Sequence, residues 1–217
     1  MINPDSLHVV FLRGDRQGEQ KAYYQKAFDL WKNVWEATFR ELDGLNYLPS
    51  DDFTRQHEIL CIFHGDDCIA LICHRYMESD NPAVLSDSYF RPWPVEAKEK
   101  FRVGKNLVIA SYITVHPDYR GRSNGISVKE ILVHSALIHL LRQGVDAITG
   151  ILRADKAMDR VMYEMGAVPL VRGITYHNVP VDLVGFFPKT HPAKAPERYA
   201  DLIDRMLESA RFTASAA

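Results

Sequence analysis

The sequence has few cysteines, and this scarcity excludes a disulfide-stabilised scaffold. Cys61, Cys68 and Cys73 are its three cysteines among 217 residues, and no two of them have a CxxC spacing. An odd number of cysteines without a signal peptide favours a reducing, cytoplasmic location. We therefore expect Cys61 and Cys73 to be buried packing residues.

Long apolar runs and an excess of one charge are also absent. No apolar run approaches the roughly 20 residues that a membrane span needs. The 26 Lys and Arg residues and 28 Asp and Glu residues give a formal net charge of −2, so no global basic field indicates nucleic acid as a partner. Hydrophobic residues at 47% and charged residues at 25% are typical of a globular protein.

Two common active-site patterns are missing as well. No G-x-S-x-G motif occurs, which argues against a serine hydrolase. His134 and His139 are five residues apart on a predicted helix, so they do not share a face, and no adjacent carboxylate completes a ligand set. We predict no metal site.

The stretch from residue 106 to residue 127 has the order strand, loop, helix. Leu107–Val115 is an apolar, β-branched run, and Pro117 ends it because proline has no N–H for a sheet ladder. A helical pattern follows over residues 127–142. The first N–H groups of a helix lie at the positive end of its dipole, so small and basic residues before them suit a phosphate. Alone, this pattern also fits an ordinary surface turn before a helix capped by Ser127.

Within this stretch, Arg122-Ser-Asn-Gly-Ile-Ser127 resembles the Arg/Gln-x-x-Gly-x-Gly/Ala signature of the GNAT acyltransferase superfamily, and Val115-His-Pro-Asp-Tyr-Arg120 resembles the segment before it. The resemblance implies a loop that wraps the pyrophosphate of coenzyme A or the phosphate of an acyl-carrier pantetheine. Ser127 departs from the Gly or Ala of the family. The cofactor-binding residues that the resemblance implies are Ile113, Thr114, Val115, Arg120, Gly121, Arg122, Ser123, Asn124, Gly125, Ile126 and Ser127.

A second segment, residues 155–167, resembles the short helix of the family that ends in Tyr-Glu-x-Gly. The family's tyrosine commonly protonates the leaving thiolate of coenzyme A, so the resemblance implies that Tyr163 is a general acid. A phenol is protonated at neutral pH and can therefore donate a proton. Without the upstream loop, packing of a helix on the sheet would explain this tyrosine.

The sequence does not identify a general base. The strand before the loop has no Asp or Glu, although attack by an amine requires removal of a proton. Tyr112, Thr114 and His116 would lie beside the thioester, and Asp87 and His74 are candidates from earlier elements. We take Tyr112 and His116, with Tyr163, as the catalytic candidates. The backbone N–H groups near residues 113–115 would polarise the thioester carbonyl.

The remaining pattern fits a mixed α/β fold. A helix over residues 18–42 has an aromatic stripe that is most simply core, or else one wall of an acceptor or acyl-chain pocket together with the loop over residues 43–54. Residues 83–104 are expected to be irregular. The other predicted elements are strands over residues 6–13, 57–64, 68–77, 145–152, 168–176 and 179–187, a helix over residues 156–165, and a C-terminal amphipathic helix over residues 197–212.

We therefore predict a GNAT-like acyltransferase domain over residues 1–188, with a linker and a C-terminal helix over residues 189–217 packed on it. It would move an acyl group from acetyl-CoA, a longer acyl-CoA or an acyl-carrier protein to a small-molecule amine. The long aromatic helix also fits relatives that resemble long-chain N-acyl amino acid synthases. The alternative is a non-catalytic module of this fold that binds acyl-CoA or a partner protein. The sequence leaves the acceptor and the oligomeric state open.

Overall fold

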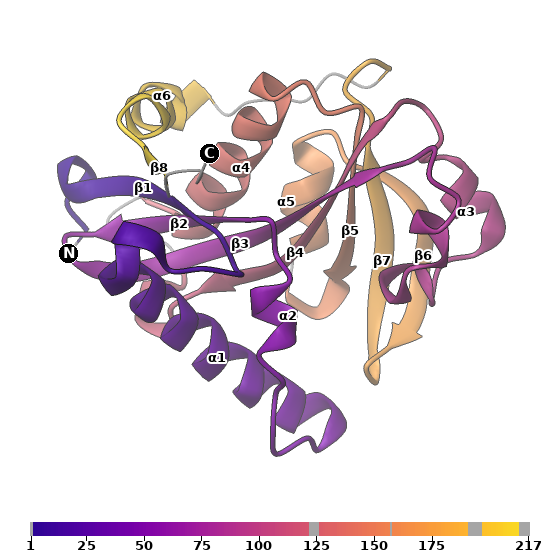
Figure 1. Cartoon of the computed structure of the whole chain (residues 1–217), viewed down its shortest axis with the longest axis horizontal. Coiled ribbons are helices and arrows are strands. Elements are labelled where there is room, and N and C mark those ends of the chain that lie inside the picture. Colours follow the sequence, from indigo (N-terminus) through magenta and orange to yellow (C-terminus); the bar gives the residue numbers. More distant parts are fainter. Residues whose placement is uncertain (1, 122–125, 157, 191–196, 213–217) are drawn as a thin grey trace. The chain divides into compact units, whose positions relative to one another are not determined.

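The computed structural model describes residues 2–121, 126–156, 158–190 and 197–212, and its chain divides into two compact units (Figure 1). The first unit comprises Met1–Arg75, Tyr112–His139 and Pro196–Ala217. The second unit comprises Tyr76–Ser111 and Leu140–Ala195. The domain boundary at residue 188 stays a prediction.

The sheet of the first unit is built mainly from antiparallel strands. β1 (Leu7–Leu12) pairs with β2 (Glu58–His64), and β2 pairs with β3 (Asp67–Glu78). Gly65 has the left-handed backbone (φ 59°) that a two-residue hairpin turn requires, which confirms the hairpin predicted here. β8 (Arg211–Phe212) adds a short parallel pairing to the other edge of β1.

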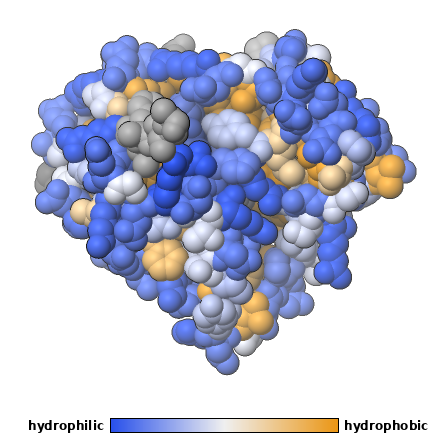
Figure 2. All heavy atoms as spheres, in the orientation of Figure 1, coloured by the Kyte–Doolittle hydropathy of each residue, from blue (hydrophilic) through white to orange (hydrophobic). Residues whose placement is uncertain are grey.

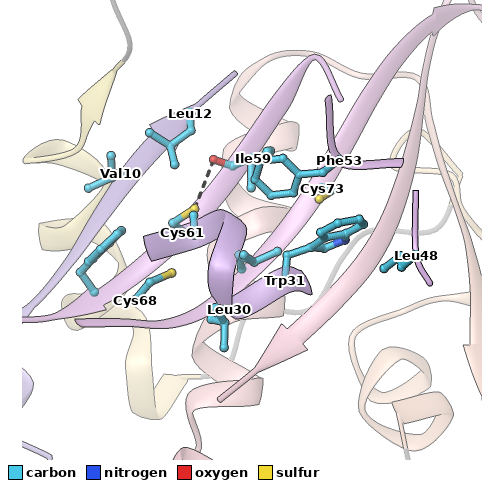
Figure 3. Packing of buried hydrophobic residues seen from close by; sticks show 13 residues of the cluster. Val10, Leu12, Leu30, Trp31, Leu48, Phe53, Ile59, Cys61, Cys68 and Cys73 are labelled. Atoms are coloured by element: carbon cyan, nitrogen blue, oxygen red, sulfur yellow. Dashed lines mark hydrogen bonds between the residues drawn. The ribbon is translucent and has the colours of Figure 1, made fainter. Parts of the chain in front are cut away.

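One face of this sheet packs on α1 (Lys21–Asp43) and α2 (Asp51–Thr54). Alternate residues of each strand point to this face because successive side chains of a strand alternate in direction. Figure 3 shows them meeting Leu30 and Trp31 of α1 and Phe53 of α2. The aromatic stripe of α1 is thus partly core, as the simpler interpretation held. The predicted burial of Cys61 and Cys73 is confirmed. Cys68 is buried as well, and all three free cysteines belong to this cluster.

The other face of the first unit's sheet packs on α4 (Val128–Arg142), as the ring contact between Phe11 and His139 shows (centroids 4.2 Å apart). α6 (Ala200–Glu208) contacts β1 and buries Ile203 and Met206. The predicted C-terminal helix is too long, because the structure ends it at Glu208. Residues 211–212 pair with β1 as a strand instead, and so satisfy backbone groups of a sheet edge.

The second unit has the strand order β6-β7-β5-β4. β4 (Asn106–Val115) pairs in parallel with β5 (Ala147–Arg153), and β5 pairs antiparallel with β7 (Val179–Phe186). β6 (Val168–Tyr176) and β7 form the predicted hairpin. Its two turn residues, His177 and Asn178, both have positive φ, as a type I′ turn requires. α5 (Met158–Glu164) confirms the predicted helix and begins two residues later.

The prediction that residues 83–104 are irregular is wrong. They contain the 3₁₀ turns Val84–Ser86 and Ser88–Phe90 and the helix α3 (Val95–Glu99). Asp87 caps the second turn by accepting a hydrogen bond from the Tyr89 N–H (2.8 Å). The aromatic side chains of this stretch supply much of the second unit's core, which fixes the short helices; they are Phe90, Trp93 and Phe101.

No helix in the part of the chain that the structure describes is both long and apolar enough to cross a membrane. Figure 2 shows hydrophilic residues over most of the face in view, with hydrophobic residues in small separate groups.

Candidate functional site

β4 has an unusual backbone at Tyr112, which lies in the left-handed region with φ of 53°. A bulky residue seldom adopts this conformation, and such strain persists only where the surroundings hold it. The pairing of β4 with β5 runs through Leu107, Val108 and Ile109, ahead of the kink. The kink therefore lies in the part of β4 that we predicted to be next to the thioester.

Hydrogen bonds from two side chains hold this kink. The Thr114 Oγ1 donates to the carbonyl oxygen of Tyr112 (2.7 Å), and the Trp35 Nε1 donates to the Thr114 Oγ1 (2.9 Å). Thr114 is almost fully buried. The first bond lies within β4, and the second ties the strand to Trp35 of α1. The sequence pattern placed Trp35 in a stripe that is core or one wall of a pocket, but it did not indicate this hydrogen bond to Thr114.

The side chain of Tyr112 belongs to the core of the first unit. Its ring meets those of Trp31 and Trp35 edge-on, with centroids 5.7 and 5.0 Å away. Burial, and then the nearby Asp52 carboxylate, raise the pKa of the Tyr112 phenol well above its usual range. The phenol is therefore protonated at neutral pH, which fits a hydrogen-bond donor better than a base.

His116 and Arg120 close the end of β4. The Nδ1 of His116 accepts from the Asp118 N–H (3.3 Å) and so caps the 3₁₀ turn Pro117–Tyr119. The Arg120 Nε donates to the Val115 carbonyl (3.1 Å), which folds the guanidinium back along the strand. Gly121 follows with φ of 89°, a conformation that favours glycine.

The start of α4 explains the departure at Ser127. Its Oγ accepts from the Glu130 N–H (3.4 Å) and so caps the helix, a role that neither Gly nor Ala can fill. The Ser127 N–H donates to the Tyr199 Oη (3.0 Å), and the Arg198 guanidinium pairs with the Glu130 carboxylate. The C-terminal segment thus borders the start of α4. The cap at Ser127 was one of the alternatives that the sequence offered, whereas the contacts of Arg198 and Tyr199 were not predicted.

Four of the predicted cofactor-binding residues lie outside the described residues. The next one, Ile126, is half-buried and forms an isolated β-bridge. Arg120, Gly121, Ile126 and Ser127 therefore frame both ends of the predicted loop within the first unit. The four residues that the structure does not describe are Arg122, Ser123, Asn124 and Gly125.

The second unit holds Tyr163, on α5. The Tyr163 hydroxyl donates to the Asp182 Oδ2, and the Asp182 Oδ1 accepts from the Gly173 N–H (2.8 Å). Asp182 is buried within β7. Burial, and then the hydrogen bond to Asp182, raise the pKa of Tyr163 well above its usual range. Sequence analysis missed Asp182, although a single acid in the apolar run Val179–Phe186 is a signal of a partnered buried carboxylate.

The other candidate residues have structural partners. The His74 Nδ1 lies 2.9 Å from the Glu58 Oε1, and the His139 Nε2 lies 3.1 Å from both oxygens of that carboxylate. The His134 Nδ1 lies 2.6 Å from the Glu130 carbonyl oxygen, and burial lowers the pKa of His134 to about 4. Among the described residues, no group of three or more His, Cys, Asp or Glu side chains is arranged to hold a metal ion.

No family model and no curated protein matches the sequence. Solved structures do match, and they identify the fold as that of GNAT acyl-CoA N-acyltransferases, as the resemblance implied. BjaI, a CoA-dependent acyl-homoserine lactone synthase solved with SAM and isopentyl-CoA, is 15% identical, with 97% of this chain and 95% of BjaI covered and a TM-score of 0.59.

Two further solved structures of this fold also match the chain. A mosquito arylalkylamine N-acetyltransferase-like protein, 5b, is 11% identical, with 84% of this chain and 100% of the neighbour covered and a TM-score of 0.62. FeeM, an N-acyl amino acid synthase from uncultured soil microbes, is 13% identical, with 83% of this chain and 91% of FeeM covered and a TM-score of 0.55. At such identities the likeness establishes the fold.

Proposed function

We propose that this chain is an N-acyltransferase that moves an acyl group from acyl-CoA to a small-molecule amine by direct attack. The observation that carries the proposal is the geometry around β4 and α4 in the first unit. A strand kinked at Tyr112 leads, through a loop with the GNAT signature, to the start of α4. The GNAT fold of the chain supports the same function.

In this proposal the acyl-CoA thioester lies beside the kinked end of β4. A bulge-like interruption redirects backbone groups of a strand, so N–H groups of residues 113–115 would polarise the thioester carbonyl. The CoA phosphates would lie at the loop from Arg120 to Ser127, where basic side chains and the positive end of α4 favour anions. Tyr112 and His116 are the proposed catalytic neighbours on the strand, and Tyr163 is the proposed proton donor to the thiolate.

The neighbours suggest which acceptors to test. BjaI was solved with SAM and isopentyl-CoA, FeeM is an N-acyl amino acid synthase, and the mosquito neighbour is named for arylalkylamines. Amino acids, SAM and arylalkylamines therefore form the first acceptor panel. Acyl donors should include acetyl-CoA, longer acyl-CoA and an acyl-carrier protein, because the sequence leaves the donor open.

A thermal-shift titration with coenzyme A, acetyl-CoA and a long-chain acyl-CoA tests the cofactor site. A ligand at about one hundred times its Kd stabilises the folded state by about 2.7 kcal/mol, so a clear rise in Tm is expected. The stabilisation should vanish in an Arg122→Ala, Gly125→Trp double variant. It should persist in Arg102→Ala, whose arginine pairs with Glu99 on the surface of the second unit.

Acyl transfer to the acceptor panel then separates an enzyme from a binding module. Release of free CoA that depends on an added amine supports the proposal. Binding of acyl-CoA without transfer to any acceptor would instead favour the non-catalytic module. If no CoA compound binds but the acyl group is transferred from an acyl-carrier protein, the donor is the carrier protein and not acyl-CoA.

A further inference from the structure

Tyr163 and Asp182 form a pair in which a phenol donates to a buried carboxylate. The Tyr163 hydroxyl bonds to one oxygen of Asp182, and the Gly173 N–H holds the other oxygen at 2.8 Å. Asp182 is 6% exposed, whereas Tyr163 is only half-buried. One end of the pair is therefore accessible to a reactant, and the other end is shielded from water.

The charges around this pair come from three elements. Arg172 of β6 places its guanidinium 5.0 Å from the centre of the Tyr163 ring, where it favours negative charge on the phenol. Asp159 of α5 lies nearby and disfavours that charge. Arg153 of β5, next to the residue that pairs with Asp182, is bound by Asp155 (2.6 Å). Asp182 is the carboxylate of this group that contacts the phenol.

We infer that Asp182 is the proton acceptor that the proposed reaction requires, and that it acts through Tyr163. This inference rests on the proposed acyltransferase function. The inference assigns the role of base to Asp182, because the strand β4 has no Asp or Glu. Since Asp182 acts through another side chain, it is a positioning residue and proton store, while Tyr163 contacts the substrate.

The proton balance of this relay closes without another reactant. The amine nitrogen attacks the thioester carbon, and the carbonyl electron pair moves to oxygen. The nitrogen then transfers its proton to the Tyr163 oxygen, while the Tyr163 proton passes to Asp182. As the carbon–sulfur bond breaks, its electron pair leaves with sulfur, and the thiolate takes a proton from Tyr163. Tyr163 recovers its proton from Asp182, so both groups return to their starting states.

The test compares Asp182→Asn, Tyr163→Phe and the double variant in steady-state acyl transfer. General acid–base groups contribute roughly 10²–10⁴-fold, so each single variant should lower kcat at least about a hundredfold. The double variant should be about as slow as either single variant, because the two groups act as a unit. Asp159→Asn is the matched control. It removes a carboxylate near Tyr163 that is outside the relay, and kcat should change by less than about threefold.

A pH profile separates the relay from a purely structural role of Asp182. In Asp182→Asn the phenol has lost its proton acceptor, but its anion can accept the amine proton itself. The kcat of Asp182→Asn should therefore rise with pH toward the wild-type value as Tyr163 ionises, near an ordinary tyrosine pKa of about 10. The double variant should show no such rise, because it has no phenol at position 163. Any pH dependence that it retains comes from other groups, such as the amine substrate.

Three outcomes overturn the inference. A wild-type kcat in Asp182→Asn, or the same pH profile with and without Tyr163, removes Asp182 from the reaction and leaves the proposed function intact. Absence of acyl transfer in the wild type overturns both the proposed function and the role of Asp182. If Asp182→Asn does not fold, a second measurement tests the inference. The absorbance of the phenolate is recorded against pH for the wild type and for Tyr163→Phe, and the difference between the two curves gives the ionisation of Tyr163. A Tyr163 that ionises near pH 10, as free tyrosine does, contradicts coupling to Asp182.

Discussion

Glu58 in the first unit is a half-buried carboxylate and Asp182 in the second unit is a buried one, and their partners differ. The Glu58 side chain, 18% exposed, lies between two imidazoles, those of His74 and His139. Asp182 lies between a phenol and a backbone N–H, those of Tyr163 and Gly173. The two carboxylates therefore differ in their hydrogen-bond partners. Glu58 contacts ring nitrogens, and Asp182 accepts from a hydroxyl group, whose proton can be transferred.

The difference follows from what each partner supplies. Burial alone raises the pKa of the Glu58 carboxyl, but hydrogen bonds from His139 and His74 outweigh it and lower that pKa well below its usual range. A carboxylate fixed in its charged form contributes to stability and is a poor proton carrier. A phenol brings no charge, and its proton lies between two oxygens. Asp182 is therefore suited to transfer a proton.

Glu58→Gln should have the largest effect on stability. Removing one member of a buried pair costs roughly 3–5 kcal/mol, because its partners are left without compensation, so a loss of about 3 kcal/mol in the free energy of unfolding is expected from urea titration. Glu36→Gln is the matched control. Its carboxylate forms a surface pair with Lys32 (3.8 Å), and such pairs contribute less than about 1 kcal/mol. Equal losses in both variants would contradict the assignment of Glu58 to a stabilising cluster.

The same cluster sets a pH dependence. The folded-state pKa of Glu58 lies below its unfolded value of about 4.3, so its contribution is fully present above that pH and is lost as the pH falls. The free energy of unfolding of the wild type should therefore fall more steeply with acidification below about pH 4.3 than that of Glu58→Gln. If the free energy of unfolding changes with pH in the same way in the wild type and in Glu58→Gln, then Glu58 has the same pKa in the folded and unfolded states.

Tyr163→Phe and Tyr112→Phe test whether the two phenols differ as their partners do. Tyr163 contacts a buried carboxylate, so its loss should lower kcat about a hundredfold, equivalent to about 2.7 kcal/mol in the barrier. Tyr112 is also near a carboxylate, that of Asp52, but its ring is packed between the indoles of Trp31 and Trp35, so its loss should lower kcat by less than about tenfold. Steady-state kinetics with one donor and one acceptor measures both. The reverse order would move the proton chemistry to β4.

Trp35→Phe should affect cofactor binding more than stability. It deletes the hydrogen bond to Thr114 that helps to hold the Tyr112 kink, at a cost of about 1 kcal/mol. If the thioester lies at this kink, KM for acyl-CoA should rise by up to about tenfold.

Trp93→Phe is the control for this substitution. The indole N–H of Trp93 has no hydrogen-bond partner among the described residues, so the change removes packing alone. Its KM should stay within about twofold of the wild type. A similar rise of KM in both variants would indicate that loss of packing, and not the kink, is responsible.

Local patterns in the sequence predict most elements of the fold. The Gly65 turn and the His177-Asn178 turn mark their hairpins, and the apolar run before Pro117 marks the central strand. The short helices near Trp93 escaped prediction because long-range aromatic packing stabilises them, and their own sequence shows little periodicity. The C-terminal strand escaped because a two-residue pairing depends entirely on the edge of β1.

The candidate site could be predicted where it depends on a motif along the chain. The segments around Ser127 and Tyr163 carry such motifs. The partners Trp35, Asp182 and Tyr199 could not be predicted in the same way. Each lies at least 19 residues from the group that it contacts, and the pairing depends on how the elements pack.

Tyr199→Phe is expected to have the smallest effect and extends the comparison to a third phenol. The Tyr199 Oη accepts a hydrogen bond from the Ser127 N–H at the start of α4. This arrangement supports a structural contact, and its loss should cost about 1 kcal/mol in urea titration, with kcat within about threefold of the wild type. Ser209→Ala, whose hydroxyl bonds to the Arg205 carbonyl on the surface of α6, is the control, with an expected change below about 0.5 kcal/mol. A hundredfold loss of kcat in Tyr199→Phe would mean that the phenol at the start of α4 carries the chemistry, and the assignment of the proton transfer to Tyr163 and Asp182 would not hold.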